Sequence, residues 1–474
     1  MHAAQQPDIH ENIFCSDTDI RHGMMPVYLL SILAVLCRKW IMNIRSTTDS
    51  DKPISPQPRP VPESSDLKIT AIETLLPHDI MPGLMLLRIH TDKGLIGHGE
   101  TYYIPHAAAA VIHDWMARRL IGSDPLSIEH HWRFFYERTS AFGSRGSELR
   151  AISAIDLALW DILGQVCRCP VWQLLGGKAR DRVRVYNSSG GPTYGRRPPG
   201  EIPDPGWPGH GDIGKPGPLE DNWSAHFAPG DLAEELVAEG YAAMKFWTFD
   251  QAYHQYGGSY LPLSVIKACV KPIEEARKRV GDKIEILLDG HGFFQLPAAL
   301  RIAEAVRDLK LLWLEDVMRL DNVDTLKDFR DKAGVPLAVS EMLISREDYR
   351  LVMEKNATDY LMVDPTWVGG ISETRRLSEM AQGYNIPVAM HDCTGPLTLF
   401  AGLHVATAVP NVVLQESVRA HIRTFYDLLI EPNIVIRDGH AIPPEKPGLG
   451  TCLKPHLFDS KHTGYRISQI SHSG

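Results

Sequence analysis

Short apolar runs recur through the second half of the chain, and each is followed by a stretch with helical periodicity. After residue 181 there are eight such runs, which we predict to be strands: Val183–Tyr186, Ala243–Trp247, Glu285–Leu288, Leu311–Leu314, Leu337–Ser340, Tyr360–Val363, Val388–Met390 and Val412–Gln415. Apolar strands that alternate with helices are typical of a parallel sheet buried on both faces. Eight such units predict an α/β fold, a (β/α)₈ TIM-type barrel, at residues 183–430.

A different pattern precedes the barrel. Residues Leu67–Leu76 and Met85–His90 alternate like strands, and Gly94–Glu100 follows a turn and returns as a third. Helical periodicity then appears at His106–Leu120 and Leu149–Gly164. Strands followed by helices predict an α+β capping domain at residues 66–182, and we expect residues 431–474 to pack back toward it.

The first 65 residues differ from the rest. The apolar run Val27–Cys37 is shorter than the roughly 20 residues needed to span a bilayer. Acidic and histidine residues precede it, and no small-residue cleavage site follows. Ser46–Ser65 is rich in Ser, Pro and Asp and is typical of a disordered linker. We therefore expect residues 1–65 to be disordered or extraneous to the mature protein, with a membrane anchor or export signal as the alternative.

Composition narrows the classes of partner. The formal net charge is -9 and no basic stripe stands out, which argues against a nucleic-acid partner. The chain has seven cysteines and no CxxC pair, which argues against a disulfide framework or a zinc site built on thiolates. This cysteine usage favours a reducing compartment, so we predict a cytoplasmic location without membrane association.

Charged residues stand at the ends of six consecutive predicted strands, from the third to the eighth. They are spaced 23–27 residues apart, about one strand–helix unit each: Asp289, Glu315, Glu341, Asp364, His391 and Glu416. Lys245 stands near the end of the second strand. Any one of these residues alone is typical of a polar strand end. Their repetition around the ring indicates an active site, because barrel enzymes place catalytic groups at the carboxyl ends of their strands.

Three of these residues suit a metal. Asp289, Glu315 and Glu341 would bring three carboxylates into one pocket, where like charges raise one another's pKa. A divalent cation removes this conflict, and an all-oxygen ligand set favours Mg²⁺, with Mn²⁺ as a substitute. The alternative is that the carboxylates pair with nearby lysine and arginine residues.

Two histidines are candidates for proton transfer. His391 and Asp364 come from adjacent strand ends, where an aspartate fixes the tautomer of a histidine and raises its basicity. His291 lies two residues after Asp289, on the same face by period-two alternation, and is a candidate second acid. The alternatives are a hydrogen-bonded structural histidine for His391 and a residue that only orients its neighbours for His291.

Several segments resemble motifs of the enolase superfamily, mandelate racemase subgroup. LRAISAIDLALWDILGQVCRCPVWQLLGG resembles the signature at the end of the family's capping domain, and ILLDGHG, LWLEDV and VSEM resemble its three metal-ligand strands. MVDPTWVGGISE, AMHDCTGP and VLQES resemble its sixth, seventh and eighth strand ends. The resemblance covers roughly residues 67–453 and implies the modified enolase-type barrel, a Mg²⁺ cofactor and a symmetric homo-oligomer, as a dimer, tetramer or octamer.

The resemblance also implies a reaction, in which a base removes the proton α to a carboxylate. Racemase-like members carry Lys-x-Lys on the second strand, whereas here Trp247 stands in place of the second lysine. The histidine on the metal strand resembles that of galactonate-type sugar-acid dehydratases. We therefore expect His391 to abstract the proton, backed by Asp364, and His291 to protonate the leaving hydroxyl. Lys245 and Glu416 would hold the substrate carboxylate.

The substrate expected from this resemblance is a small sugar acid, an aldonate or aldarate. His78, Tyr103 and Trp247 are the candidate substrate-binding residues, because the capping domain's early loop closes over the barrel mouth in this family. The long Pro- and Gly-rich stretch Ser188–Gly230 follows the first barrel strand, and we expect it to cover the pocket. A racemase, epimerase or cycloisomerase on the same fold, and a non-catalytic metal-binding barrel, are the rival hypotheses.

Overall fold

The computed structural model describes residues 65–143, 145–192, 194 and 213–469. Our predictions for residues 1–64 and for the middle of the Ser188–Gly230 stretch lie outside the described residues.

Eight parallel strands form a closed ring. They are β4 (Val183–Ser188), β5 (Ala243–Phe246), β6 (Glu285–Asp289), β7 (Trp313–Glu315), β8 (Leu337–Val339), β9 (Tyr360–Val363), β10 (Val388–Met390) and β11 (Val412–Ser417). Each strand pairs with the next in sequence, and β11 also pairs with β4. This closure confirms the predicted (β/α)₈ barrel.

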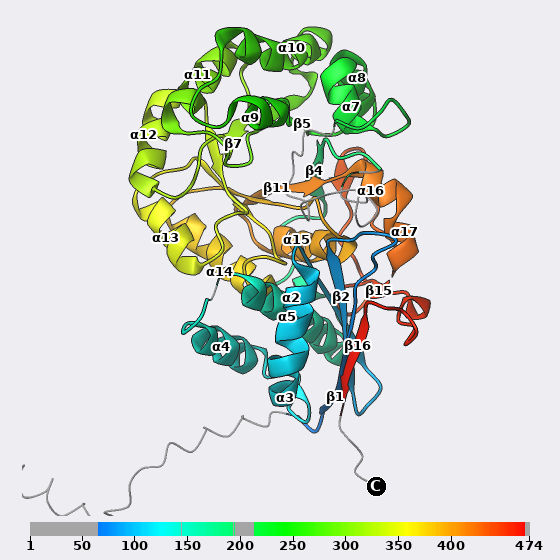
Figure 1. The fold of residues 1–474 in the computed structure, drawn as a ribbon. Helices are drawn as coiled ribbons and strands as arrows, with labels where there is room; N and C mark the ends of the chain where they lie inside the picture. Colours follow the sequence, from blue (N-terminus) through cyan, green and yellow to red (C-terminus); the bar gives the residue numbers. More distant parts are fainter. Residues whose placement is uncertain (1–64, 144, 193, 195–212, 470–474) are drawn as a thin grey trace, which may run out of the picture. The chain divides into compact units, whose positions relative to one another are not determined.

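Helices follow the strands and curve around their outside, as the arc from α10 to α14 shows (Figure 1). They are α7 (Asp221–Phe227), α8 (Pro229–Ala238), α9 (Asp250–Tyr256), α10 (Leu263–Val280), α11 (Leu296–Val306), α12 (Val323–Ala333), α13 (Arg346–Glu354), α14 (Gly370–Gly383), α15 (Pro396–Ala408), α16 (Arg419–Thr424) and α17 (Tyr426–Leu429). Short 3₁₀ turns end α10 at Gly281–Lys283 and α11 at Arg307–Leu309.

The N-terminal capping region is a four-stranded antiparallel sheet with helices packed on it. The strands are β1 (Ile69–Leu75), β2 (Leu84–Thr91), β3 (Ile96–Tyr102) and β16 (Tyr465–Gln469), in the order β16-β1-β2-β3. The helices are α2 (Pro105–Val111), α3 (Ala117–Leu120), α4 (Ile128–Thr139), α5 (Ser147–Cys167) and α6 (Val171–Leu174), with a π-helical turn at Ile112–Met116. Strand β16 therefore brings the C-terminal segment back to the first strand of the capping region.

The remaining C-terminal elements are short. Strand β12 (Ile430–Glu431) pairs with β15 (Cys452–Leu453), and a 3₁₀ turn follows at Pro455–Leu457. Strand β13 (Ile436–Arg437) pairs with β14 (His440–Ala441), which in turn pairs antiparallel with the barrel strand β4.

Two glycines allow the long helix α5 to lie directly on β3. A Cβ atom on Gly97 would stand 2.1 Å from the carbonyl oxygen of Ala158, and one on Gly99 would stand 2.0 Å from that of Ala154. Both separations are far below van der Waals contact. Only glycine permits this spacing, so these two positions set how closely the helix approaches the sheet.

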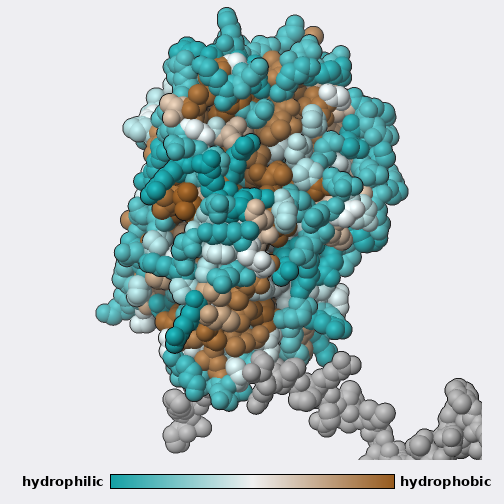
Figure 2. Space-filling model, turned by 180° about the vertical axis from the view of Figure 1, so that it is seen from behind, coloured by the Kyte–Doolittle hydropathy of each residue, from teal (hydrophilic) through white to brown (hydrophobic). Residues whose placement is uncertain are grey.

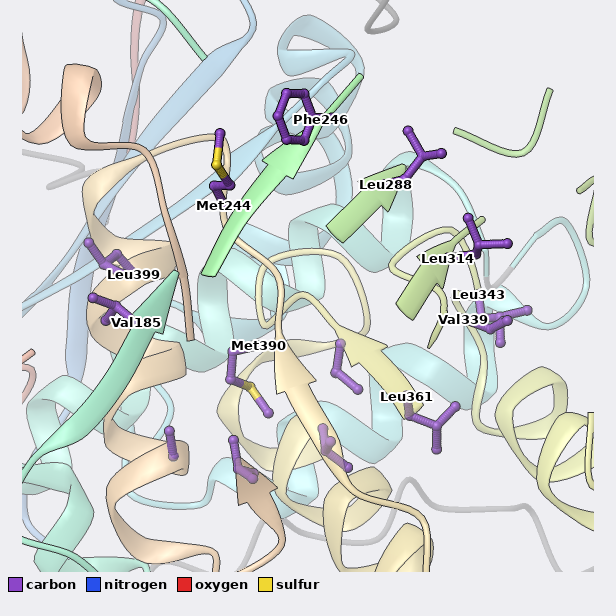
Figure 3. Packing of buried hydrophobic residues seen from close by; sticks show 14 of the residues in the cluster. Val185, Met244, Phe246, Leu288, Leu314, Val339, Leu343, Leu361, Met390 and Leu399 are labelled. Carbon is purple, nitrogen blue, oxygen red and sulfur yellow. The ribbon is translucent and has the colours of Figure 1, made fainter. Parts of the chain in front are cut away.

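The barrel wall has an outer and an inner apolar layer. Outward-facing side chains such as Val185, Met244, Phe246 and Leu288 pack under the helices (Figure 3). The inner layer takes one residue from each of the eight strands: Tyr186, Ala243, Leu287, Trp313, Ala338, Met362, Ala389 and Leu414. The large rings of Tyr186 and Trp313 meet edge to face, with centroids 5.9 Å apart. The barrel interior is therefore a packed floor.

The surface is mostly hydrophilic on the face shown in Figure 2, with hydrophobic residues gathered in a few places. Phe142, Phe227 and Tyr260 are among the large apolar residues that remain exposed, which is normal for a globular protein. Among the helices in the described ranges, none is long and apolar enough to cross a bilayer. The oligomeric state stays a prediction.

Candidate active site

The barrel's inner layer positions the charged residues found in the sequence. Each of the eight strands carries a polar residue two positions after its inner-layer residue, where side chains point inward again. These residues are Ser188, Lys245, Asp289, Glu315, Ser340, Asp364, His391 and Glu416, and all of them are buried. They form the next layer above the apolar floor.

Glu341 departs from this period. The position two residues after Ala338 is Ser340, whose hydroxyl donates to Asp316, and Glu341 comes one residue later. Glu341 nevertheless lines the pocket above the floor. Its side chain enters the pocket from the turn that follows β8. The alternation of side chains along β8 therefore does not predict its position.

Lys245 lies at the centre of the carboxylates. Its Nζ is 2.6 Å from Glu315 Oε1, 2.7 Å from Glu416 Oε1 and 3.2 Å from Asp289 Oδ2. Burial alone would lower the pKa of Lys245, but the carboxylates of Glu315 and Glu416 outweigh it and hold the pKa well above its usual value. These carboxylates therefore favour the charged form of Lys245.

The predicted metal ligands disfavour one another's charged forms. Burial and the neighbouring carboxylates raise the pKa of Glu315 well above its usual value, and burial likewise raises the pKa of Glu341. Glu341 Oε2 is buried and has no hydrogen-bond partner in the described part of the chain. An unpaired carboxylate oxygen beside further carboxylates suits a hard divalent cation.

The three carboxylates do not yet surround one point. Among the described residues, no group of three His, Cys, Asp or Glu side chains has an arrangement that could hold a metal ion. Asp289 and Glu315 are paired in register across β6 and β7, but both are in contact with Lys245. The ligand types fit Mg²⁺, and the assignment of Asp289, Glu315 and Glu341 as its ligands stays a prediction.

His391 and Asp364 form the expected pair. His391 Nδ1 is 2.8 Å from Asp364 Oδ2, and both side chains are buried. The other oxygen of Asp364 accepts hydrogen bonds from Thr366 N at 2.7 Å and Thr366 Oγ1 at 2.8 Å. Burial would lower the pKa of His391, but Glu341 and other acidic neighbours raise it well above its usual value. The Nε2 atom faces the pocket, 3.5 Å from Cys393 Sγ.

His291 occupies the other side of the pocket. Its Nδ1 is 3.0 Å from Asp250 Oδ1, and its Nε2 is 3.5 Å from Asp289 Oδ2. Burial would lower the pKa of His291, but these two carboxylates outweigh it and raise the pKa to about 9. Because Asp250 holds Nδ1, the Nε2 atom is the ring nitrogen that a ligand in the pocket can meet.

The pocket is narrow and is walled by aromatic rings. Its cavity of about 10 Å³ is lined by Tyr103, Lys245, Trp247, Asp289, His291, Glu341, Trp367, His391, Cys393 and Glu416. The indole Nε1 atoms of Trp247 and Trp367 are buried, and neither has a hydrogen-bond partner among the residues that the structure describes. Two such donors in the wall can bind hydroxyl or carboxylate oxygens of a ligand.

The capping region contributes directly to this wall. The Tyr103 ring lies against Trp367, with centroids 5.4 Å apart, and the buried guanidinium of Arg150 stacks on Trp367 at 4.0 Å. Thr101 Oγ1 also donates to the carbonyl of Thr366 at 2.9 Å. These contacts hold the capping region on the loop that follows β9.

The candidate substrate-binding residues divide into two groups. Trp247 and Tyr103 line the pocket, whereas the ring of His78 stacks on His106 at 5.2 Å and lies 6.4 Å from His462. From the insertion, Tyr194 lies against Trp247, with ring centroids 5.1 Å apart. Residues 195–212 of that insertion lie outside the described residues.

Sequence reasoning missed Asp250, Trp367 and Arg150. Asp250 lies three residues after Trp247, at the start of a short helix, where an acidic residue is common. Trp367 stands three residues after Asp364 and could have been found by the same strand-end argument. Arg150 carries no such signal, because its place beside the pocket depends on how α5 packs.

The chain matches two family models in the order of its two parts. Residues 78–176 match the N-terminal domain of mandelate racemase and muconate lactonizing enzyme, and residues 229–457 match the enolase C-terminal domain-like family. The chain belongs to the mandelate racemase/muconate lactonizing enzyme family of the enolase superfamily. The resemblance stated from the motifs is thereby confirmed.

Relatives of this family member include dehydratases. It is 31% identical to the D-xylonate dehydratase of Haloferax volcanii over 395 residues, which are 82% of this chain and 87% of that protein. It is 28% identical to the D-galactonate dehydratase of Pectobacterium atrosepticum, over 82% of this chain and 93% of that protein. The prediction of an enzyme, a hydro-lyase of the enolase superfamily, is confirmed at this level.

A solved structure gives the same fold. An enolase protein from the environmental genome sequencing of the Sargasso Sea superimposes with a TM-score of 0.73 at 34% identity. The match covers 85% of this chain and 99% of that one. The family member thus shares both the barrel and the capping region of its superfamily.

Proposed function

We propose that the protein is a Mg²⁺-dependent dehydratase of sugar acids, which converts an aldonate or aldarate into a 2-keto-3-deoxy acid. The observation that carries this proposal is the arrangement of two histidines around one pocket. His391 follows β10 and His291 follows β6, which are four strands apart in a ring of eight. They therefore approach a bound ligand from opposite sides.

His391 acts as the base in this proposal. Its Nδ1–H donates to Asp364, so Nε2 of the neutral ring can take the C2 proton of the substrate, and a divalent cation on Glu341 would offset the carboxylate that most raises the pKa of His391. Lys245 Nζ and the Glu416 carboxylate bind the carboxylate end of the substrate. A divalent cation held by Asp289, Glu315 and Glu341 would supply electrostatic stabilisation of the negative charge that develops on that carboxylate.

His291 acts as the acid. Its Nε2–H protonates the C3 hydroxyl as the C3–O bond breaks, and the electron pair of that bond leaves with the water formed. The enol that remains tautomerises to the 2-keto-3-deoxy acid. Each proton transfer of this kind contributes about 10²–10⁴-fold to the rate. The two indole donors of Trp247 and Trp367 would bind the hydroxyl oxygens farther along the chain of the substrate.

The substrate class is supported by the relatives and by the pocket. The curated relatives named above act on D-xylonate and D-galactonate. Among the described residues that line the cavity, Lys245 is the one lysine or arginine. This favours aldonates, which carry one carboxylate, over aldarates, which carry two.

A library screen tests the proposal. The protein is incubated with aldonates and aldarates and Mg²⁺, with and without EDTA, and α-keto acids are detected with semicarbazide. We expect keto acid from at least one aldonate, loss of the signal with EDTA, and loss of the signal in His391→Asn. Undiminished dehydration by His391→Asn would contradict the assigned base.

Racemisation or epimerisation is a second candidate, because two histidines on opposite sides of C2 could also exchange its proton. Trp247 in place of a second lysine disfavours the lysine-based version of that reaction but not a histidine-based one. Exchange of the C2 hydrogen with inversion and without keto acid would favour this candidate over dehydration.

A further inference from the structure

The histidine on the metal strand has a carboxylate partner of its own. His291 Nδ1 lies 3.0 Å from Asp250 Oδ1, and the side chains are 5% and 8% exposed. Asp250 is the first residue of α9. The hydrogen bond to His291 offsets part of the cost of burying this carboxylate.

The pair repeats the arrangement of His391 and Asp364. Asp364 and His391 follow the neighbouring strands β9 and β10, and Asp250 and His291 follow the neighbouring strands β5 and β6. In each pair the aspartate comes from the earlier strand and contacts Nδ1 of the histidine. Since β5 and β6 lie opposite β9 and β10 in the ring, two histidine–aspartate pairs face each other across one pocket.

Asp250 also limits how the ring of His291 can turn. The backbone of His291 is in the left-handed region, with φ 48, and its N–H donates to Asp289 Oδ1 at 2.9 Å. The indole of Trp247 lies against the ring, with centroids 5.5 Å apart. With Nδ1 held by Asp250, the ring presents Nε2 to the cavity, and a doubly protonated ring can give up the Nε2 proton while Nδ1–H stays bonded to Asp250.

We propose that Asp250 is a positioning residue for leaving-group protonation, which holds the His291 ring so that Nε2–H points at the departing hydroxyl. This inference rests on the proposed dehydratase function and assigns a role to a residue that does not itself touch the substrate. During the step the Nε2–H bond breaks and the proton joins the leaving oxygen. Nδ1–H stays on the ring and remains bonded to Asp250.

The proposal separates the two halves of the reaction. Loss of Asp250 impairs protonation of the leaving group and leaves proton removal by His391 intact. A substrate that has lost its C2 proton but cannot expel water takes a proton back from the same base. In D₂O the recovered substrate therefore gains deuterium at C2, which a general loss of folded enzyme would not produce.

The experiment compares Asp250→Leu and Asp250→Asn with the wild type in D₂O, on the aldonate that the screen identifies. Asp250→Leu removes the acceptor, and we expect dehydration to fall about 10²–10³-fold while deuterium appears at C2 of the recovered acid. Asp250→Asn keeps an acceptor oxygen, so its loss is expected to be smaller. Asp364→Asn is the matched control at the opposite pair and is expected to lose both exchange and dehydration.

A double-variant comparison covers the case in which Asp250→Leu does not fold. His291→Asn alone is expected to lose dehydration and to keep exchange, and adding Asp250→Asn to it is expected to cost nothing further. Equal losses of exchange and dehydration in the folded Asp250 variants, or additive losses in the double variant, would overturn the inference. Wild-type enzyme that dehydrates no acid would instead overturn the proposed function, and the inference with it.

Discussion

Asp364→Asn is a sharp test of the proposed base, because the structure dictates which way the new amide must turn. The Oδ1 atom of Asp364 accepts two hydrogen bonds from Thr366, at 2.7 Å and 2.8 Å, whereas Oδ2 accepts one from His391 Nδ1. A carboxamide has a single acceptor oxygen, which takes the Oδ1 position. Its NH₂ group then faces His391.

The amide therefore reverses the tautomer of the base. With a donor opposite it, His391 Nδ1 must accept a hydrogen bond, so the ring proton moves to Nε2. A ring with Nε2 protonated cannot take the C2 proton of a substrate. We expect proton removal to slow by about 10³–10⁴-fold, which corresponds to about 4–5 kcal/mol in the activation barrier. KM should change little, because Asp364 does not line the pocket.

The assay follows the C2 hydrogen of the sugar acid by NMR in D₂O, together with the keto acid formed, so that every proton removal is counted. Asp359→Asn is the matched control, because Asp359 lies at the amino end of the same strand and pairs with Arg330 at 2.6 Å. We expect that variant to react at the wild-type rate. If Asp364→Asn is folded and removes the proton within tenfold of the wild-type rate, the assignment of His391 as the base is wrong.

Three further expectations follow from the fold and the site. Gly99→Ala places a Cβ 2.0 Å from the carbonyl oxygen of Ala154 and should destabilise the protein by about 1–3 kcal/mol in urea unfolding, whereas Gly383→Ala, which meets open space, should not. Burial would raise the pKa of Glu73, but its histidine, tyrosine and arginine partners lower the pKa to about 2, below the usual 4.5. The stabilisation from Glu73 is therefore complete above pH 4.5 and is lost as the pH falls toward 2. We expect a loss of about 1–2 kcal/mol in the free energy of unfolding, because the partners are partly exposed. Glu73→Gln should make the free energy of unfolding less dependent on pH in this range. Mg²⁺ should raise the melting temperature of the wild type in a calorimetric scan, and should raise that of Glu341→Gln by less. An equal rise in the wild type and the variant would show that Glu341 is not a metal ligand.

Much of the barrel was predictable because its signals are local. The strand predicted at Tyr360–Val363 coincides with β9, and the charged strand ends follow from period-two alternation above the inner layer. The helix predicted at His106–Leu120 is interrupted by a π-helical turn at Ile112–Met116, for which the sequence shows no breaker.

The rest of the site depends on contacts between distant segments. Asp250 becomes significant only because the loop after β5 lies beside the loop after β6. Arg150 lies on Trp367, 217 residues away in sequence, because α5 packs against α14 and the loop before it. Such partners cannot be read from spacing along one strand. The positions of His78 and Trp367 relative to the pocket required the folded chain for the same reason.

The layered barrel interior makes the chemistry of this protein inseparable from the alignment of its strands. Six of the charged residues stand two positions after a residue of the apolar floor: Lys245, Asp289, Glu315, Asp364, His391 and Glu416. Deleting or inserting a single residue within a strand would turn its charged side chain outward and bring an apolar neighbour into the pocket. Changes of length are tolerable only in the loops beyond the strand ends, as in the long insertion between β4 and β5. Diversification of this scaffold is therefore confined to its loops, where new substrates can be recognised without disturbing proton transfer.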